Sequence, residues 1–203
     1  MDDKVYEIKE SSIADPGPLG LAGFALTTAA LSASNAGIIP ASLGLVFLPL
    51  ALVYGGSVQM FAGMWEYKKN NTFGATAFTS FGAFWIALAI MLLLVFGKVI
   101  SFGKDNSDLG IAIGFYLVLW TIFTFYLWIA SFGISNGLAT LFTLLLITFI
   151  LLDVGNLGGG AVMVKVGGWF GILTALMAWY LSAAGVLNPM FKRVVLPVGP
   201  KVH

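Results

Sequence analysis

Long apolar stretches alternate with short polar breaks along this chain. Six of the stretches reach the roughly 20 residues that a helix needs to cross a bilayer. They cover residues 18–38, 43–65, 74–96, 110–132, 137–157 and 163–186. The breaks between them carry residues that favour turns: Pro40, Asn70-Asn71, Asn106, Asn136-Gly137 and Gly158-Gly159-Gly160. The pattern predicts an all-α membrane protein with six transmembrane helices.

Composition supports a place in the lipid bilayer. Of the 203 residues, 59% are hydrophobic and only 9% are charged, whereas a soluble domain has roughly 25% charged residues. So little polar surface cannot cover a water-soluble globule. We therefore expect an integral membrane protein.

The same composition excludes several functions. A net charge of +1 gives no electrostatic case for binding nucleic acid. The chain has no cysteine, and its one histidine is the last residue, so disulfides, thiolate metal sites and cysteine nucleophiles are excluded. It also lacks a serine–base pair, a phosphate-binding loop and a zinc-protease motif. We expect neither an enzyme nor a bound metal or cofactor.

Basic residues predict the orientation. With six spans, both termini lie on the side of the connections that follow the second and fourth spans. That side holds seven basic residues, which are Lys4, Lys9, Lys68, Lys69, Lys192, Arg193 and Lys201. The opposite side holds three, which are Lys98, Lys104 and Lys165. Since basic residues gather on the cytoplasmic side, we expect a cytoplasmic tail of residues 1–15, a transmembrane domain of residues 16–187 and a cytoplasmic tail of residues 188–203.

The two halves of the chain show a faint similarity. Gly23-Phe24 in the first span is echoed by Gly114-Phe115 in the fourth. Two sets of three spans would then form a 3+3 inverted repeat, an arrangement common in transporters. Chance similarity between apolar segments is the favoured explanation of the echo.

The first span opens on an unusual sequence for a membrane helix, Asp15-Pro16-Gly17-Pro18-Leu19-Gly20. Proline removes a backbone donor, and glycine lets another backbone or a ligand approach closely. Unsatisfied backbone groups are costly in a membrane, so such a stretch belongs where it packs tightly or lines a cavity. We interpret it as a place where a small solute passes.

Neutral polar side chains lie inside the predicted spans, whereas arginine and histidine do not. Thr27 and Thr28 lie in the first span, Gln59 in the second and Asn156 at the end of the fifth. Each can hydrogen-bond to another helix or line a wet path, and both alternatives stay open. The pair Gly55-Gly56 is likewise open between helix packing and solute access. With no deep cation, a solute would be held by uncharged donors, aromatic rings and backbone.

Two carboxylates accompany the spans. Glu66 ends the second span just before Lys68 and Lys69, and we interpret it as a solvated helix end. Asp153 is different, because a charged side chain at the bilayer centre costs about 2.5–3.5 kcal/mol on insertion scales. It should therefore pair, take up a proton or face water. A pair with Lys165 or a place in an external vestibule is favoured over a proton-handling role.

Phe24 and Phe81 each stand beside glycine and small polar residues. Aromatic rings in such a setting can form a hydrophobic constriction, which gates a pore by dewetting. From the local sequence alone, packing in the core is the favoured interpretation of both rings.

Several segments together form an ordered set of motifs: residues 15–24 (DPGPLGLAGF), residues 54–68, residues 71–85, Gly155-Asn156, and the tail segments 187–188 and 196–199. The first resembles an N-P-x-P-L-G-L-x-x-F signature. The whole set is similar to the acetate uptake transporter family, the succinate–acetate permeases of bacteria, archaea and fungi. The resemblance covers nearly the whole chain.

The resemblance implies a plasma-membrane protein that moves acetate and related short monocarboxylates, with succinate in some members. It also implies a ring-shaped homo-oligomer, a hexamer, with one pathway per subunit. The narrowest point of that pathway is an apolar ring, which maps onto Phe24, Phe81 and Leu145. The polar lining would then consist of Thr27, Thr28, Gln59 and Asn156. Passage would be channel-like or coupled to protons.

Three positions depart from the family pattern. Asp15 stands where the family usually has asparagine; either residue can cap a helix, but the extra charge would alter anion entry. Phe81 stands where related proteins often have tyrosine, which makes the constriction drier. Asp153 stands where other members can have an uncharged residue.

Two other functions compete with acetate transport. A channel for a neutral small solute, such as urea, an amide or ammonia, would share the apolar pore and the lack of buried cations. A membrane scaffold or sensor without transport is disfavoured, because it needs no mid-span amides and threonines.

Overall fold

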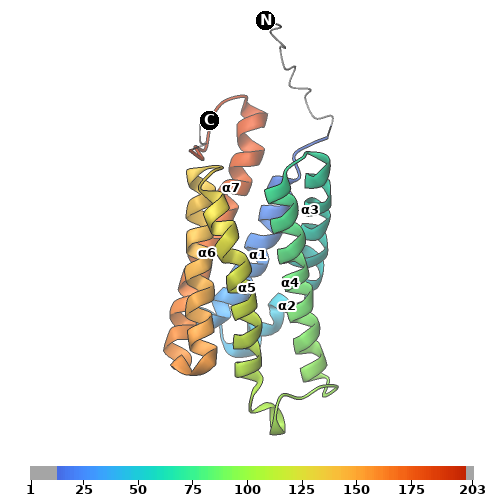
Figure 1. Cartoon of the computed structure of the whole chain (residues 1–203), viewed down its shortest axis with the longest axis vertical. Helices are drawn as coiled ribbons and strands as arrows, with labels where there is room; N and C mark the ends of the chain where they lie inside the picture. The colour runs from blue at the N-terminus through green and yellow to red at the C-terminus, as the bar shows by residue number, and fades with distance from the viewer. Residues whose placement is uncertain (1–12, 200–203) are drawn as a thin grey trace, which may run out of the picture.

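The computed structural model describes residues 13–199, which are almost entirely helical and form no strand (Figure 1). The main helices are α1 (Gly17–Asn35), α2 (Phe47–Leu52), α3 (Gln59–Lys68), α4 (Thr72–Phe96), α5 (Leu109–Ser131), α6 (Asn136–Val154) and α7 (Gly160–Phe191). Shorter turns of helix join them: η1 (Ala41–Val46), η2 (Val53–Val58), η3 (Lys104–Asn106) and η4 (Gly155–Gly159). The remaining parts of the two expected tails, residues 1–12 and 200–203, lie outside the described residues.

Four helical stretches are long and apolar enough to cross a membrane, namely Ser42–Lys68, Thr72–Phe96, Leu109–Ser131 and Asn136–Phe191. The last spans 56 residues but folds back on itself. Gly158 and Gly160 have φ angles of 121° and 80°, a conformation that glycine adopts without steric cost. The chain reverses there, and α7 packs along α6 (Figure 1). The predicted all-α membrane class is confirmed.

Helix α1 lies in the middle of the bundle, between α7 on one side and the η2–α3 segment on the other (Figure 1). Its close contacts depend on residues that have no side chain. A Cβ on Gly171 of α7 would collide with Ser32, and a Cβ on Gly23 would lie 2.7 Å from the carbonyl oxygen of Tyr54. Small residues let helices approach in this way within membranes. They fix α1 as the axis around which the other helices pack.

The second apolar stretch is less regular than the continuous span predicted at 43–65. It begins as the 3-10 helix η1, continues through α2 and the π-helix η2, and only then becomes α3. Gly55 and Gly56 are buried within η2. A Cβ on Gly55 would collide with Thr27, and one on Gly56 with the carbonyl oxygen of Ala51. The Cβ of Gly56 would also lie 2.5 Å from Ile86 of α4. Because Gly55 and Gly56 thus lie against α1 and α4, the contacts favour helix packing over solute access for this pair.

Helix α7 continues past residue 186, where the final span was predicted to end, and stops at Phe191. The chain then turns back because Asn188 binds the following segment. Its Oδ1 accepts hydrogen bonds from the backbone N–H groups of Val195 and Leu196, at 2.8 and 2.9 Å. The hydrogen bonds of Asn188 therefore hold the described part of the C-terminal tail against the end of α7.

Candidate functional site

Two cavities lie inside the bundle, one towards each end of α1. The first, named here the Asn156 cavity, has a volume of about 160 Å³ and is lined by the second half of α1 with parts of α2, α4, α5, α6, η4 and α7. The second, the Gln59 cavity, measures about 210 Å³ and is lined by the first half of α1 with parts of α3, α4 and α6. Both walls are mainly apolar, and both cavities have room for a solute of a few non-hydrogen atoms.

Three side chains separate the two cavities. Within residues 13–199, Phe24, Phe81 and Leu145 are the residues that line both. They come from α1, α4 and α6, and their exposed fractions are only 6%, 3% and 4%. The rings of Phe24 and Phe81 lie 5.7 Å apart between centroids, within the range of direct aromatic contact. The structure thus brings together, at one closed apolar point, the three residues that the family resemblance selected.

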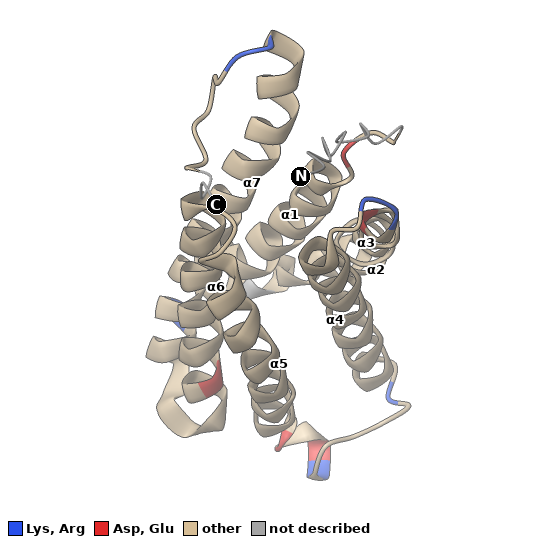
Figure 2. Cartoon of the chain, turned by 45° about the horizontal axis from the view of Figure 1, so that its top comes forward, with Lys and Arg blue, Asp and Glu red and all other residues tan. Residues whose placement is uncertain are grey.

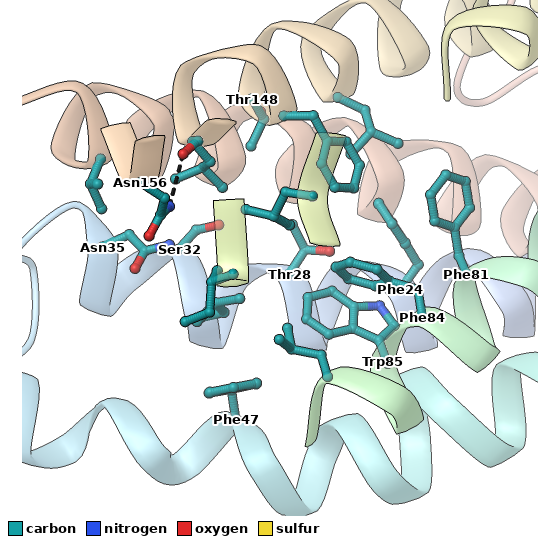
Figure 3. A pocket seen from close by; sticks show the side chains of 18 of the residues that line it. Phe24, Thr28, Ser32, Asn35, Phe47, Phe81, Phe84, Trp85, Thr148 and Asn156 are labelled. Carbon is teal, nitrogen blue, oxygen red and sulfur yellow. Dashed lines mark hydrogen bonds between the residues drawn. The ribbon is translucent and has the colours of Figure 1, made fainter. Parts of the chain in front are cut away.

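The Asn156 cavity carries polar atoms close to this point (Figure 3). The hydroxyl of Thr28 and the indole Nε1 of Trp85 are buried, and neither has a hydrogen-bond partner. Asn156 also lines the wall, and its Nδ2 donates to the carbonyl oxygen of Leu152 at 2.8 Å. A buried donor without a partner costs roughly 1–3 kcal/mol. Thr28 and Trp85 are thus residues of the cavity wall whose donor groups have no partner within the described residues.

The Gln59 cavity has an equivalent group. The side chain of Gln59 is 1% exposed, and both its Oε1 and its Nε2 are buried without a partner. An amide can donate and accept at the same time. The two cavities thus each present unpartnered neutral polar groups, one set on either side of the apolar point.

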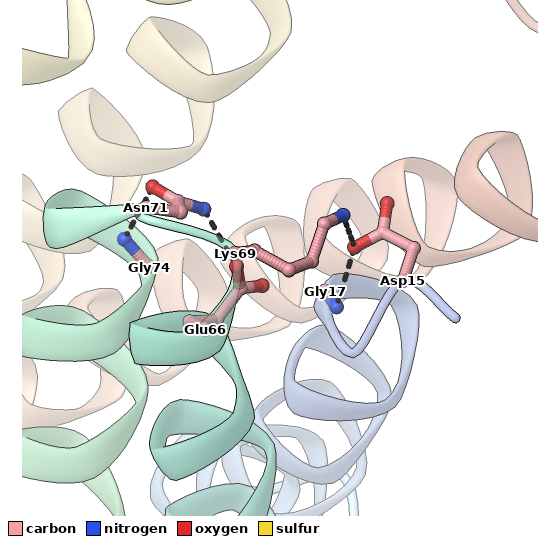
Figure 4. Close-up of polar contacts among 6 residues, drawn as sticks. All are labelled: Asp15, Gly17, Glu66, Lys69, Asn71 and Gly74. Carbon is pink, nitrogen blue, oxygen red and sulfur yellow. Dashed lines mark hydrogen bonds and ion pairs between the residues drawn. The ribbon is translucent and has the colours of Figure 1, made fainter. Parts of the chain in front are cut away.

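The mouth of the Gln59 cavity is bridged by polar contacts (Figure 4). Asp15 accepts a hydrogen bond from the backbone of Gly17 at 3.0 Å and forms an ion pair of 3.0 Å with Lys69. Asn71 donates to Glu66 at 2.8 Å and accepts from the first turn of α4. These contacts tie the start of α1 to the connection between α3 and α4.

Glu66 differs from its prediction as a solvated helix end. It is only 1% exposed and lines the Gln59 cavity. Its position could have been found from spacing, because Glu66 follows Gln59 by two helical turns and so shares its face. Trp85 was also missed, although it follows Phe81 by one turn.

Two predicted site residues lie outside both cavities. Thr27 packs against Gly55, with its hydroxyl 3.5 Å from the carbonyl oxygen of Leu50. Asp153 lies in the contact between α6 and α5, where its Oδ2 is 2.6 Å from the hydroxyl of Thr121. The expected pair with Lys165 is not formed.

Charged side chains gather near the helix ends and connections, which leaves the middle of the bundle almost uncharged (Figure 2). No group of three or more histidine, cysteine or carboxylate residues that could hold a metal ion occurs in the described part of the chain. The site can therefore bind a solute through neutral donors and apolar walls.

An apolar helical bundle with two cavities that meet at a closed point has the organisation of a membrane transport protein. The model of the GPR1/FUN34/yaaH family matches residues 1–200. The chain belongs to this family, which confirms the resemblance to the acetate uptake transporters.

Individual relatives and a solved structure also support the family assignment. The chain is similar to the succinate-acetate/proton symporter SatP of Escherichia coli (strain K12), with 39% identity over 189 residues that cover 93% of this chain and 97% of the relative. It is also similar to the ammonia transport outward protein 2 of Saccharomyces cerevisiae, with 42% identity over 173 residues, 85% of this chain and 61% of the relative. Among solved structures, the bacterial acetate channel SatP matches with a TM-score of 0.83 and 40% identity, over 92% of this chain and 99% of that chain. The predictions of a transport protein rather than an enzyme, and of a multi-pass plasma-membrane protein, are confirmed.

Proposed function

We propose that this chain carries acetate and related short monocarboxylates, and also succinate, across the plasma membrane by a path inside each subunit. One observation carries the proposal: Phe24, Phe81 and Leu145 line both cavities. A solute that moves between the cavities must pass this ring, which we infer to be the constriction of the path. The similarity to SatP supplies the chemical class of the solute.

We infer that the chain crosses the membrane six times with both termini in the cytoplasm. The crossings are α1, the segment from η1 to α3, α4, α5, α6 and α7. The reversal at Gly158 and Gly160 supports the separation of α6 from α7, and the excess of basic residues on the side of the termini supports the orientation. The Gln59 cavity would then face the cytoplasm and the Asn156 cavity the outside.

A carboxylate that crosses the ring must shed part of its hydration. Thr28 and Trp85 on one side and Gln59 on the other offer the hydrogen bonds that replace this water. Asn156 adds an amide to the wall of the outer cavity. Because no deep cation holds the anion, binding is weak and exchange is fast, as in a channel or a symporter that carries its proton with the substrate.

We further infer that six subunits form a ring. Helix α5 supports this inference, because only 17% of its most apolar window is buried within one subunit. Its outer face carries large apolar side chains, which are Ile111, Phe115, Leu119, Ile122, Phe125 and Ile129. Such a face is suited to a neighbouring subunit or to lipid.

Uptake of radiolabelled acetate by proteoliposomes tests the proposal. The purified protein should raise uptake above that of protein-free liposomes, and unlabelled propionate should compete. An imposed pH gradient at equal acetate then separates the mechanisms: uphill accumulation indicates symport, and equilibration at the membrane potential indicates a channel. Absence of any acetate uptake would refute the proposal.

A second candidate is passage of a neutral small solute, ammonia in particular. Its support is the similarity to a protein named for ammonia transport and the apolar walls, whereas the similarity to SatP favours acetate. The same vesicles decide, because ammonia or urea flux that acetate does not compete with would point to this alternative.

A further inference from the structure

Asp153 lies one layer behind the wall of the Asn156 cavity. Its side chain is 8% exposed and sits between α6 and α5. Its chain neighbours Leu152 on α6 and Asn156 on η4 line the cavity, and so does Leu117 on the facing helix α5. A charge on Asp153 would therefore act on any solute in that cavity, across a thin apolar layer that screens it weakly.

Asp153 receives one hydrogen-bond donor in the described part of the chain, the hydroxyl of Thr121, and its other carboxyl oxygen has no partner there. The hydroxyl of Thr121 lies 2.6 Å from Asp153 Oδ2 and 3.1 Å from the carbonyl oxygen of Leu117. A hydroxyl has one hydrogen to donate. With the carboxyl group ionised, Thr121 donates this hydrogen to Asp153. With the carboxyl group protonated, Asp153 can donate to Thr121, which then donates to the carbonyl oxygen of Leu117, so both contacts become hydrogen bonds. The arrangement therefore accommodates a neutral acid.

Among residues 13–199, no ion pair compensates an ionised Asp153. Its Oδ1 is buried without a partner. The titratable groups on the helices packed against α6 are Tyr116 and Tyr126 on α5 and Lys165 and Tyr180 on α7. Tyr116 and Tyr180 donate to the carbonyl oxygens of Phe84 and Pro197, Tyr126 is half exposed, and Lys165 lies beside Gly37.

We propose that Asp153 is a proton-binding site whose occupancy is coupled to that of the Asn156 cavity by a carboxylate anion. The proton comes from water in the cavity and returns to it. Two like charges close together in an apolar setting disfavour each other. An anion in the cavity therefore favours the protonated form of Asp153, and by reciprocity the protonated form favours the anion. This inference rests on the proposed function, since it names acetate as the anion.

Infrared difference spectroscopy of the reconstituted protein tests the site. Exchange of chloride for acetate, at constant mildly alkaline pH, is expected to add one C=O band of a protonated carboxyl group. D153N is expected to lose this band. T121V should keep the band and shift it to higher wavenumber, because the acid loses its partner. D105N, at an exposed carboxyl group that lines neither cavity, is the control, and it should keep the band unshifted.

Flux provides a second measurement, which a purely structural role of Asp153 would not change. After subtraction of protein-free liposomes, the ratio of acetate flux between mildly acidic and mildly alkaline buffer should fall about tenfold in D153N, within the usual range of coupling between sites. If D153N fails to fold, the band shift in T121V still tests the site. A wild type that carries acetate but shows no acetate-induced band that D153N loses overturns this inference alone. A wild type with the Asp153 band on acidification but no acetate flux overturns the proposed function instead.

Discussion

Replacement of Leu145 by alanine is expected to raise acetate flux. Leu145 is 4% exposed and borders both cavities. The substitution removes three carbon atoms from the ring, and the space joins the two cavities because it opens into each of them. A water molecule, which takes roughly 30 Å³ in the liquid, can then accompany the carboxylate through the ring.

The size of the increase in flux follows from the one hydrogen bond that the carboxylate keeps with this water as it crosses the ring. Loss of one hydrogen bond by a buried polar group costs about 1–3 kcal/mol, and more for a charged group. If the variant avoids that loss at the top of the barrier, the rate rises roughly five- to 150-fold. Selectivity should fall at the same time, because larger monocarboxylates such as butyrate also fit through the wider ring.

The assay is the initial rate of labelled acetate uptake in proteoliposomes, with butyrate as the larger substrate. Leu127→Ala is the matched control: Leu127 is also 4% exposed but lines neither cavity. Both variants lose buried packing, so both should have a lower melting temperature, and only L145A should conduct faster. Equal rates and equal selectivity in the wild type and L145A would refute the assignment of Leu145 to the constriction.

Three further predictions concern the walls and the mouth. Gln59→Leu should lower acetate flux, because the Gln59 cavity loses its amide donor. The melting temperature should stay the same or rise, because an unpartnered buried amide disappears. A large drop in melting temperature would argue that Gln59 is structural. Gly56→Ala should destabilise by about 1–3 kcal/mol through overpacking, since its Cβ would collide with a backbone carbonyl. Gly110→Ala is the control and should be tolerated in thermal unfolding, because its Cβ would make only an ordinary contact of 3.8 Å with the carbonyl oxygen of Asn156. Lys69→Ala should change the free energy of unfolding by less than about 1 kcal/mol, because its ion pair with Asp15 is partly exposed. The same variant should take up acetate more slowly than the wild type at low salt. If it is still slower at high ionic strength, the electrostatic explanation is contradicted.

Adjacent residues show where prediction from the sequence stopped. Thr27 and Thr28 have the same side chain and were assigned the same role. One residue of helix turns the side chain by about 100°, so Thr28 faces the cavity and Thr27 packs against Gly55. The local sequence contains no signal that tells which of the two faces a cavity, because that depends on the neighbours of α1.

The carboxylates show the same limit. Glu66 was predicted to be solvated because two lysines follow it. Of these two lysines, Lys69 forms an ion pair, and its partner is Asp15 rather than Glu66. Asp153 was expected either to pair across the turn with Lys165 or to lie in an external vestibule, but it meets Thr121 on α5 instead. Both outcomes depend on which helices lie side by side.

The sequence by itself determined the membrane location, the helices and the family. Apolar length, turn residues and the scarcity of charge are local properties, and a bilayer leaves the backbone little choice but to form helices. The tertiary structure decided the site. Phe24, Phe81 and Leu145 are far apart along the chain and meet only because α1, α4 and α6 pack around a common point. Such contacts depend on the shapes of distant segments, for which small residues such as Gly23 and Gly171 leave the space.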